Sequence, residues 1–115
     1  MYIPDIELRS KDTIRQYQQK EVLHLLGYLR QFSPFYKAWF AQHNVRLEEI
    51  TSLEELSRIP PVTKEDLQEH NWDFLCVDKS KIAEYTTTSG TLGKPVIIAL
   101  TEKDLQRLTY NEYIS

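Results

Sequence analysis

Two of the three glycines in this 115-residue chain fall in one four-residue stretch, from Gly90 to Gly93. Serine and threonine residues crowd the positions around it, and Lys94 follows. The stretch lies between two runs rich in β-branched residues, at 82–88 and 95–100, so we expect two strands joined by a glycine-containing loop. Apolar residues before position 70 recur at helical spacing instead. The chain therefore predicts a helical first half followed by a β-hairpin.

The first predicted helix begins at a cap, Ser10 or Asp12, and runs to about Arg30. Four apolar residues between positions 22 and 29 recur at i, i+3, i+4 and i+7, which indicates one buried stripe. Gly27 lies inside this helix and costs about 1 kcal/mol relative to alanine. We therefore expect another element to pack closely against that position.

Three further helical segments are predicted from their caps. Ser33 followed by proline has the favoured order of an N-cap and a first helical residue, and this helix should end near position 44. Four aromatic residues between positions 35 and 40 are expected to form core with one exposed edge. Ser52 and Glu55 have capping-box spacing and predict one or two turns. Thr63 and Asp66 predict a short helix to about position 69.

The last helix should begin at Thr101, bury Leu105 and Leu108, and continue to Ser115. This order predicts an α/β fold with a helical segment over 10–70, a hairpin over 82–100 and a helix over 101–115. Two strands alone are marginal in water, so residues 1–115 are expected to be one incomplete piece of a larger domain. Further strands would come from more sequence or from a second copy of the chain.

Composition excludes several classes of partner and site. The net charge is −3 and no basic face stands out, which argues against nucleic acid. No run approaches the roughly 18 apolar residues of a membrane span. The start lacks a signal peptide and Cys76 is the single cysteine, so a cytoplasmic, reducing setting and a buried, inert thiol are expected. His24, His43 and His70 are far apart, so we expect no metal site.

The glycine-containing loop has the chemistry of a phosphate cradle. Backbone N–H groups, hydroxyl donors and one ammonium together suit a polyphosphate. The Walker pattern does not fit, because the glycines are too close together and Pro95 follows Lys94 where a serine or threonine is required. Serine, threonine and glycine are also common turn residues, so a plain connection between strands is the alternative.

Residues 88–95, T-S-G-T-L-G-K-P, resemble the phosphate loop of the adenylate-forming enzymes, the acyl-CoA synthetases and their relatives. The S-P-F-Y sequence at 33–36 and the stretch 52–67 are similar to the region that precedes this loop in phenylacetate–CoA ligases. The resemblance covers the chain from about position 21 onward. It implies that the chain is part of the large N-terminal domain of such a ligase.

In this family ATP and a small-molecule carboxylic acid form an acyl-adenylate, and coenzyme A then displaces AMP to give a thioester. The resemblance implies that the loop binds the β- and γ-phosphates, together with Mg²⁺. The phosphate contacts carried over to this chain are Thr88, Ser89, Gly90, Thr91, Gly93 and Lys94. Leu92 departs from the family pattern, since its side chain cannot donate a hydrogen bond. The family's catalytic residues have no counterpart here, so we expect the chain alone to be inactive.

Other readings remain open from the sequence. The chain could be a stand-alone, non-catalytic module that binds a nucleotide or assembles with itself. In either case, uncovered strand edges and apolar faces predict self-association, with the hairpin as the segment that copies could exchange.

Overall fold

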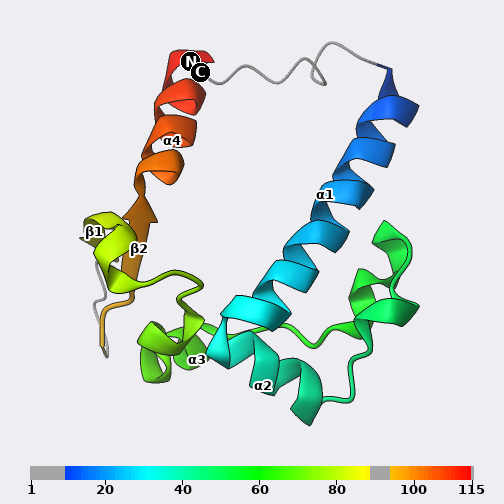
Figure 1. The fold of residues 1–115 in the computed structure, drawn as a ribbon, viewed down its shortest axis with the longest axis horizontal. Helices are drawn as coiled ribbons and strands as arrows, with labels where there is room; N and C mark the ends of the chain where they lie inside the picture. Colours follow the sequence, from blue (N-terminus) through cyan, green and yellow to red (C-terminus); the bar gives the residue numbers. More distant parts are fainter. Residues whose placement is uncertain (1–9, 89–93, 115) are drawn as a thin grey trace.

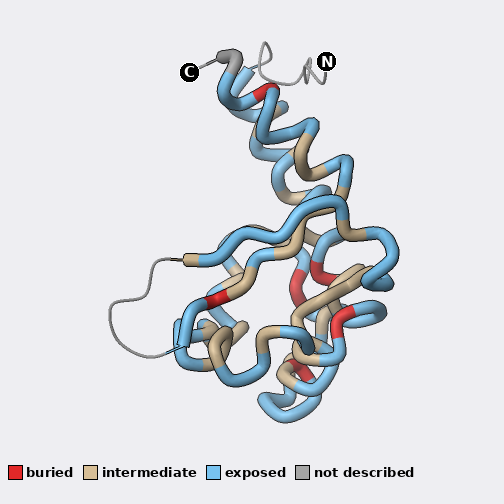
Figure 2. Tube along the Cα trace, turned by 90° about the vertical axis from the view of Figure 1, so that its left-hand side faces the viewer, coloured by how far each residue is buried: buried red, intermediate tan, exposed pale blue. Residues whose placement is uncertain are grey.

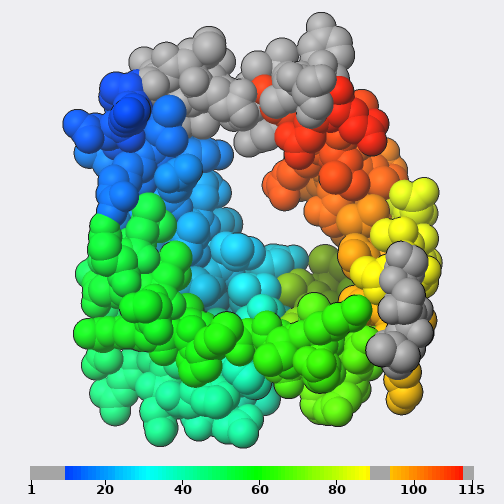
Figure 3. Space-filling model, turned by 180° about the vertical axis from the view of Figure 1, so that it is seen from behind, coloured from blue at the N-terminus to red at the C-terminus, as the bar shows by residue number. Residues whose placement is uncertain are grey.

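A computed structural model describes residues 10–88 and 94–114. The chain has the shape of a U (Figure 1), with helix α1 (Lys11–Phe32) as one arm. The hairpin and helix α4 (Glu102–Ile114) form the other arm, and helices α2 (Pro34–Gln42) and α3 (Lys64–Glu69) lie at the base. Viewed from behind, an opening separates the two arms (Figure 3). The radius of gyration is 16.1 Å, whereas a compact chain of this length would have about 13 Å.

A single serine forms the corner between α1 and α2. The N–H of Ser33 donates to the carbonyl of Leu29 at 2.9 Å and ends α1 two residues beyond the predicted Arg30. Its hydroxyl then accepts from the N–H of Tyr36 at 3.3 Å, so the same residue caps α2. Because Pro34 occupies the first turn, the predicted order of cap and proline is present.

Helix α2 ends at Gln42, before the predicted position, because Asn44 adopts a left-handed conformation with φ of 55°. Two short 3₁₀ segments follow, at Leu47–Glu49 and Leu53–Arg58. The capping box expected at Ser52 is wrong in detail, since the Ser52 side chain makes no cap hydrogen bond. The Glu55 carboxylate instead accepts from the backbone N–H of Thr51 at 3.1 Å.

A buried apolar cluster lies where α1, α2 and the two 3₁₀ segments meet. Leu26, Phe40 and Ile50 are its buried members, with Phe40 only 2 % exposed. The tube in Figure 2 shows how few residues are fully buried. The other aromatic residues of α2 are half-buried, so the predicted core position is confirmed for Phe40, and no single exposed edge stands out among the rest. The close packing expected at Gly27 is wrong, because a Cβ there would meet nothing within 4 Å.

The hairpin consists of β1 (Ile82–Thr87) and β2 (Ile97–Thr101), paired antiparallel with Thr87 opposite Ile97 and a register shift near Ile82. Both strands are shorter on the loop side than predicted. Helix α4 begins with a reciprocal cap, in which the Thr101 N–H donates to Asp104 Oδ2 at 2.9 Å and the Asp104 N–H donates to Thr101 Oγ1 at 3.3 Å.

The buried face of α4 is not the predicted one. Leu108 was expected to point inward, but it is 46 % exposed. Tyr110 is the buried residue instead, at 4 % exposure. Leu105, the other residue expected inside, is half-buried. An apolar stripe is buried along its whole length only where another element packs against all of it. Helix α4 borders the opening of the U, so part of its stripe stays exposed.

Candidate functional site

Two of the six predicted phosphate-binding residues lie among the described residues, namely Thr88 and Lys94. Thr88 is half-buried just after β1, and Lys94 is exposed three residues before β2. Ser89, Gly90, Thr91 and Gly93 lie outside the described residues, as does Leu92. The site can therefore be built from the two residues on either side of the glycines and from what supports them.

Thr88 and Val96 close the base of the loop. The Thr88 N–H donates to the carbonyl of Val96 at 3.0 Å, and the Val96 N–H donates to Thr88 Oγ1 at 3.1 Å. Val96 is 6 % exposed, so this closure is partly shielded from water. The Thr88 hydroxyl therefore has a structural task that sequence reasoning did not foresee. Because the hydroxyl accepts in this bond, its own hydrogen stays available for a further acceptor.

Two residues from the α3 region contact the other side of the loop base. Gln68 Nε2 donates to the carbonyl of Lys94 at 2.6 Å. Asn71, the first residue of the 3₁₀ segment η4 (Asn71–Phe74), pairs with Ile97 twice, donating to its carbonyl and accepting from its N–H, each at 2.7 Å. Sequence reasoning missed both residues. No periodic pattern links positions 26 residues apart, so only the folded chain reveals these contacts.

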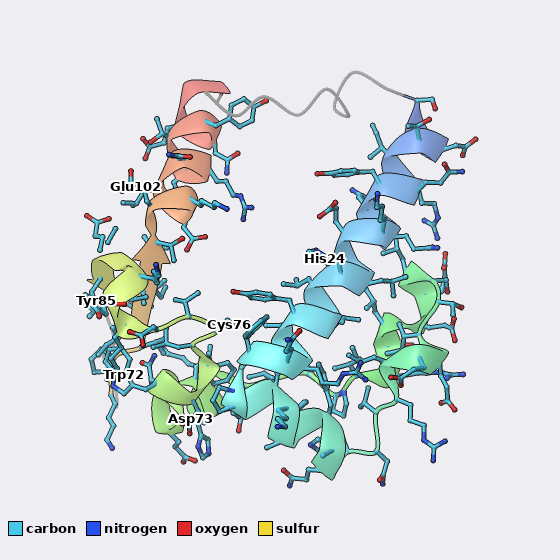
Figure 4. All side chains as sticks on the ribbon, in the orientation of Figure 1. His24, Trp72, Asp73, Cys76, Tyr85 and Glu102 are labelled. Atoms are coloured by element: carbon cyan, nitrogen blue, oxygen red, sulfur yellow. The ribbon has the colours of Figure 1, made fainter. Side chains whose placement is uncertain are left out.

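A cleft of about 410 Å³ lies between this segment and the start of β2, bordered by residues 68–73 on one side and by Lys94, Pro95 and Ile97 on the other. Trp72 stands at its edge, close to Tyr85 of β1 (Figure 4), with their ring centroids 6.0 Å apart. Trp72 and Lys94 both line this cleft.

Cys76 is the single cysteine, and the described residues contain no candidate metal centre. Cys76 is half-buried rather than fully buried, and this burial raises the pKa of its thiol. Its sulfur lies 3.7 Å from the carbonyl oxygen of Phe74. Over residues 10–88 and 94–114, the structure contains no group of three histidine, cysteine or acidic side chains that could hold a metal ion. Within the same residues, no helix is long and apolar enough to cross a membrane.

Comparison with known proteins gives the chain its relatives. It is 31% identical over 107 residues to the phenylacetate–coenzyme A ligase of Thermus thermophilus. This match covers 92% of this chain and 24% of that protein. The corresponding ligase of Pseudomonas putida is 28% identical over 101 residues. The chain is a distant homologue of the phenylacetate–coenzyme A ligases. It spans about a quarter of the length of the curated relatives that it matches. No protein-family model matches the sequence.

Solved structures share the fold of this chain. A crystal structure of 2-hydroxyisobutyryl-CoA ligase in complex with 2-HIB-AMP and CoA matches with a TM-score of 0.84 and 23% identity, covering 96% of this chain and 26% of that one. The same ligase in its postadenylation state, with 2-HIB-AMP, matches with a TM-score of 0.79, 22% identity and coverage of 88% of this chain and 22% of that one. The expected order of helices, an antiparallel hairpin and a final helix is confirmed, and it matches about a quarter of the solved ligase structure.

Proposed function

We propose that this chain is the phosphate-binding segment of an ATP-dependent carboxylate–CoA ligase of the phenylacetate–CoA ligase kind. The observation that carries the proposal is the 31% identity to the Thermus ligase over 92% of the chain. The two described site residues support it, since Lys94 and Thr88 present a cation and a hydroxyl at the two ends of one loop. Both groups suit the oxygens of a polyphosphate.

In this proposal the residues of the loop act on the leaving pyrophosphate. Charge moves onto that group as the substrate carboxylate attacks the α-phosphorus, and a preorganised ammonium and hydroxyl lower the energy of the transition state. Lys94 supplies the positive charge, and the free hydrogen of Thr88 supplies one donor. Mg²⁺ on the phosphates would supply further charge neutralisation.

Substitution of Lys94 tests the proposal. Lys94→Gln removes the charge and keeps most of the stem. Loss of one charge-assisted hydrogen bond should raise the Kd for pyrophosphate about tenfold to hundredfold. Lys94→Arg keeps the charge, so a smaller rise is expected. The amide resonances of Thr88 and Lys94, followed by NMR during titration with ATP and with pyrophosphate, report binding.

Lys37→Gln is the matched control, because Lys37 is an exposed lysine on α2. It should leave both affinities unchanged. An equal effect of Lys37→Gln and Lys94→Gln would reduce the interaction to general charge attraction. No response of the unsubstituted chain up to millimolar ligand would favour the plain-connection reading of the loop instead.

Ligation itself is expected only from a complete enzyme, with the carboxylic acid, ATP and CoA as its partners. The chain corresponds to 24% of the Thermus ligase, so we propose that it is inactive alone. A pyrophosphate-release assay with aryl and alkyl acids should show no turnover, and turnover would overturn this part of the proposal. The cytoplasmic setting also remains a proposal, based on Cys76 as the single cysteine.

We further propose that the chain self-associates through β1. Among the described residues, β2 is the only strand that pairs with β1. Peptide groups alternate sides along a strand, so those of Tyr85 and Thr87 face away from β2 and leave an open edge. Thr87→Pro removes one outward N–H without removing a bond to β2, and it should lower the apparent mass in sedimentation. A monomer at millimolar concentration would contradict self-association.

A further inference from the structure

The segment formed by α3 and the start of η4 contacts the backbone of the hairpin at two residues. One is Lys94, which precedes β2, and the other is Ile97, the first residue of β2. Gln68 bonds the carbonyl of Lys94 at 2.6 Å, and Asn71 bonds both backbone groups of Ile97 at 2.7 Å. The Asn71 amide thus occupies the place of a peptide group in a neighbouring strand. Three hydrogen bonds from one short segment fix the backbone on both sides of Pro95 and Val96.

The Lys94 side chain depends on this backbone for its direction. No ion pair to its ammonium is present within the described residues, and the side chain is exposed. A long side chain without a partner points wherever its own main chain directs it, within its rotamers. The Gln68 bond falls on the carbonyl of Lys94 itself, so it restricts that main chain directly.

The supporting segment is in turn fixed to the rest of the fold. Phe74 at the end of η4 stacks on Phe35 of α2, with ring centroids 3.9 Å apart, and meets Tyr36 edge-on. The Ser33 hydroxyl lies 3.4 Å from the carbonyl of Asp73. Stacked and edge-on ring pairs add stabilisation beyond the burial of area. Contacts between neighbouring residues therefore connect the α1–α2 corner with the backbone of Lys94 without a gap.

We propose that Gln68 and Asn71 are positioning residues for Lys94, which they aim at the phosphates of the ligand. This inference rests on the proposed function. Neither side chain is required to touch the ligand, since both are already engaged with backbone groups of the hairpin. Their effect is to keep the loop base in a binding geometry before the ligand arrives, so that less ordering free energy is lost on binding.

Two near-isosteric, uncharged substitutions test the inference. Gln68→Met removes the donor to Lys94 and should raise the Kd for pyrophosphate about fivefold, the worth of one net hydrogen bond. Asn71→Leu removes both bonds to Ile97 and should raise it about tenfold or more. Gln42→Met is the matched control, because Gln42 is exposed at the end of α2. Pyrophosphate is titrated well below the melting temperature of each variant, with folding checked by circular dichroism.

A second readout separates positioning from general stability. Asn71→Leu should speed hydrogen exchange of the Ile97 amide, which loses its acceptor, whereas Gln68→Met should leave that amide protected. Lower melting temperatures with unchanged Kd in Gln68→Met would overturn the inference even if Asn71→Leu failed to fold. The unsubstituted chain could bind pyrophosphate while Gln42→Met raised the Kd as much as Gln68→Met does. In that case the inference would be wrong and the proposed function would stand. No binding by the unsubstituted chain would overturn the proposed function, and the inference with it.

Discussion

Replacing Ser33 by alanine should destabilise the α1–α2 corner by about 2 kcal/mol. Ser33 is 1 % exposed, and its hydroxyl accepts from the Tyr36 N–H at 3.3 Å and lies 3.4 Å from the Asp73 carbonyl. Loss of an N-cap costs about 1 kcal/mol. Loss of the second, long hydrogen bond in a buried place costs about 1 kcal/mol more. A free energy of unfolding of about 5–15 kcal/mol is typical of a domain, so the change is easily measured.

The loss can be followed by urea denaturation at the Trp39 indole N–H resonance, which reports on this corner because that group donates to the Pro60 carbonyl at 3.1 Å. The midpoint should fall while the slope with urea stays unchanged. Ser33→Gly separates the two contributions, since glycine is a tolerable N-cap and costs only a few tenths of a kcal/mol there.

Ser57→Ala is the control for these variants. Its hydroxyl is exposed and bonds only the Glu54 carbonyl within its own turn, so the expected change is below about 0.5 kcal/mol. A loss below about 0.5 kcal/mol for Ser33→Ala as well would refute the reasoning, because the corner would then be stable without its hydroxyl bonds.

Three further outcomes are expected. Gly27→Ala should stabilise the chain by up to about 1 kcal/mol, because nothing lies within 4 Å of a Cβ there, and a lower melting temperature would contradict it. Burial raises the pKa of Cys76, so iodoacetamide at about pH 8.5, the ordinary thiol pKa, should react more slowly with the folded chain than with the urea-unfolded one, as measured by mass spectrometry. Hydrogen bonds from Thr63 lower the pKa of Asp66, so their stabilising effect is present above about pH 4 and is lost as pH falls through the lower, folded pKa. Asp66→Asn should therefore flatten part of the acid-induced loss of stability, and an unchanged acid profile would count against it.

Local patterns in the sequence predicted the caps well. Thr63 and Asp66 form the expected reciprocal cap of α3, and Ser33 caps α2 as expected. A cap depends on residues three positions apart, so its whole geometry is present in a short stretch of sequence. Ser52 and Glu55 have the same spacing, yet the Glu55 carboxylate bonds Thr51, because a tighter 3₁₀ turn forms there.

Contacts across the chain could not be predicted in this way. The bonds from Gln68 and Asn71 to the hairpin join positions 26 residues apart and depend on how α3 meets β2. Leu108 fits an apolar stripe, but whether a stripe is buried depends on a facing element that periodicity does not specify. For the candidate site, the sequence predicted which residues gather at the loop, while the support beneath Lys94 became visible only in the fold.

The separation of the two arms has a thermodynamic consequence. The cluster around Leu26, Phe40 and Ile50 belongs to the α1 side of the U, whereas Val96 and Tyr110 lie in the hairpin and α4, outside that cluster. The described residues of the two arms share no buried cluster, so the arms need not melt together. In calorimetry the total heat of unfolding should then exceed the van't Hoff enthalpy of any single transition. A ligand bound at Lys94 should raise the temperature of the hairpin-arm transition more than that of the α1-arm transition.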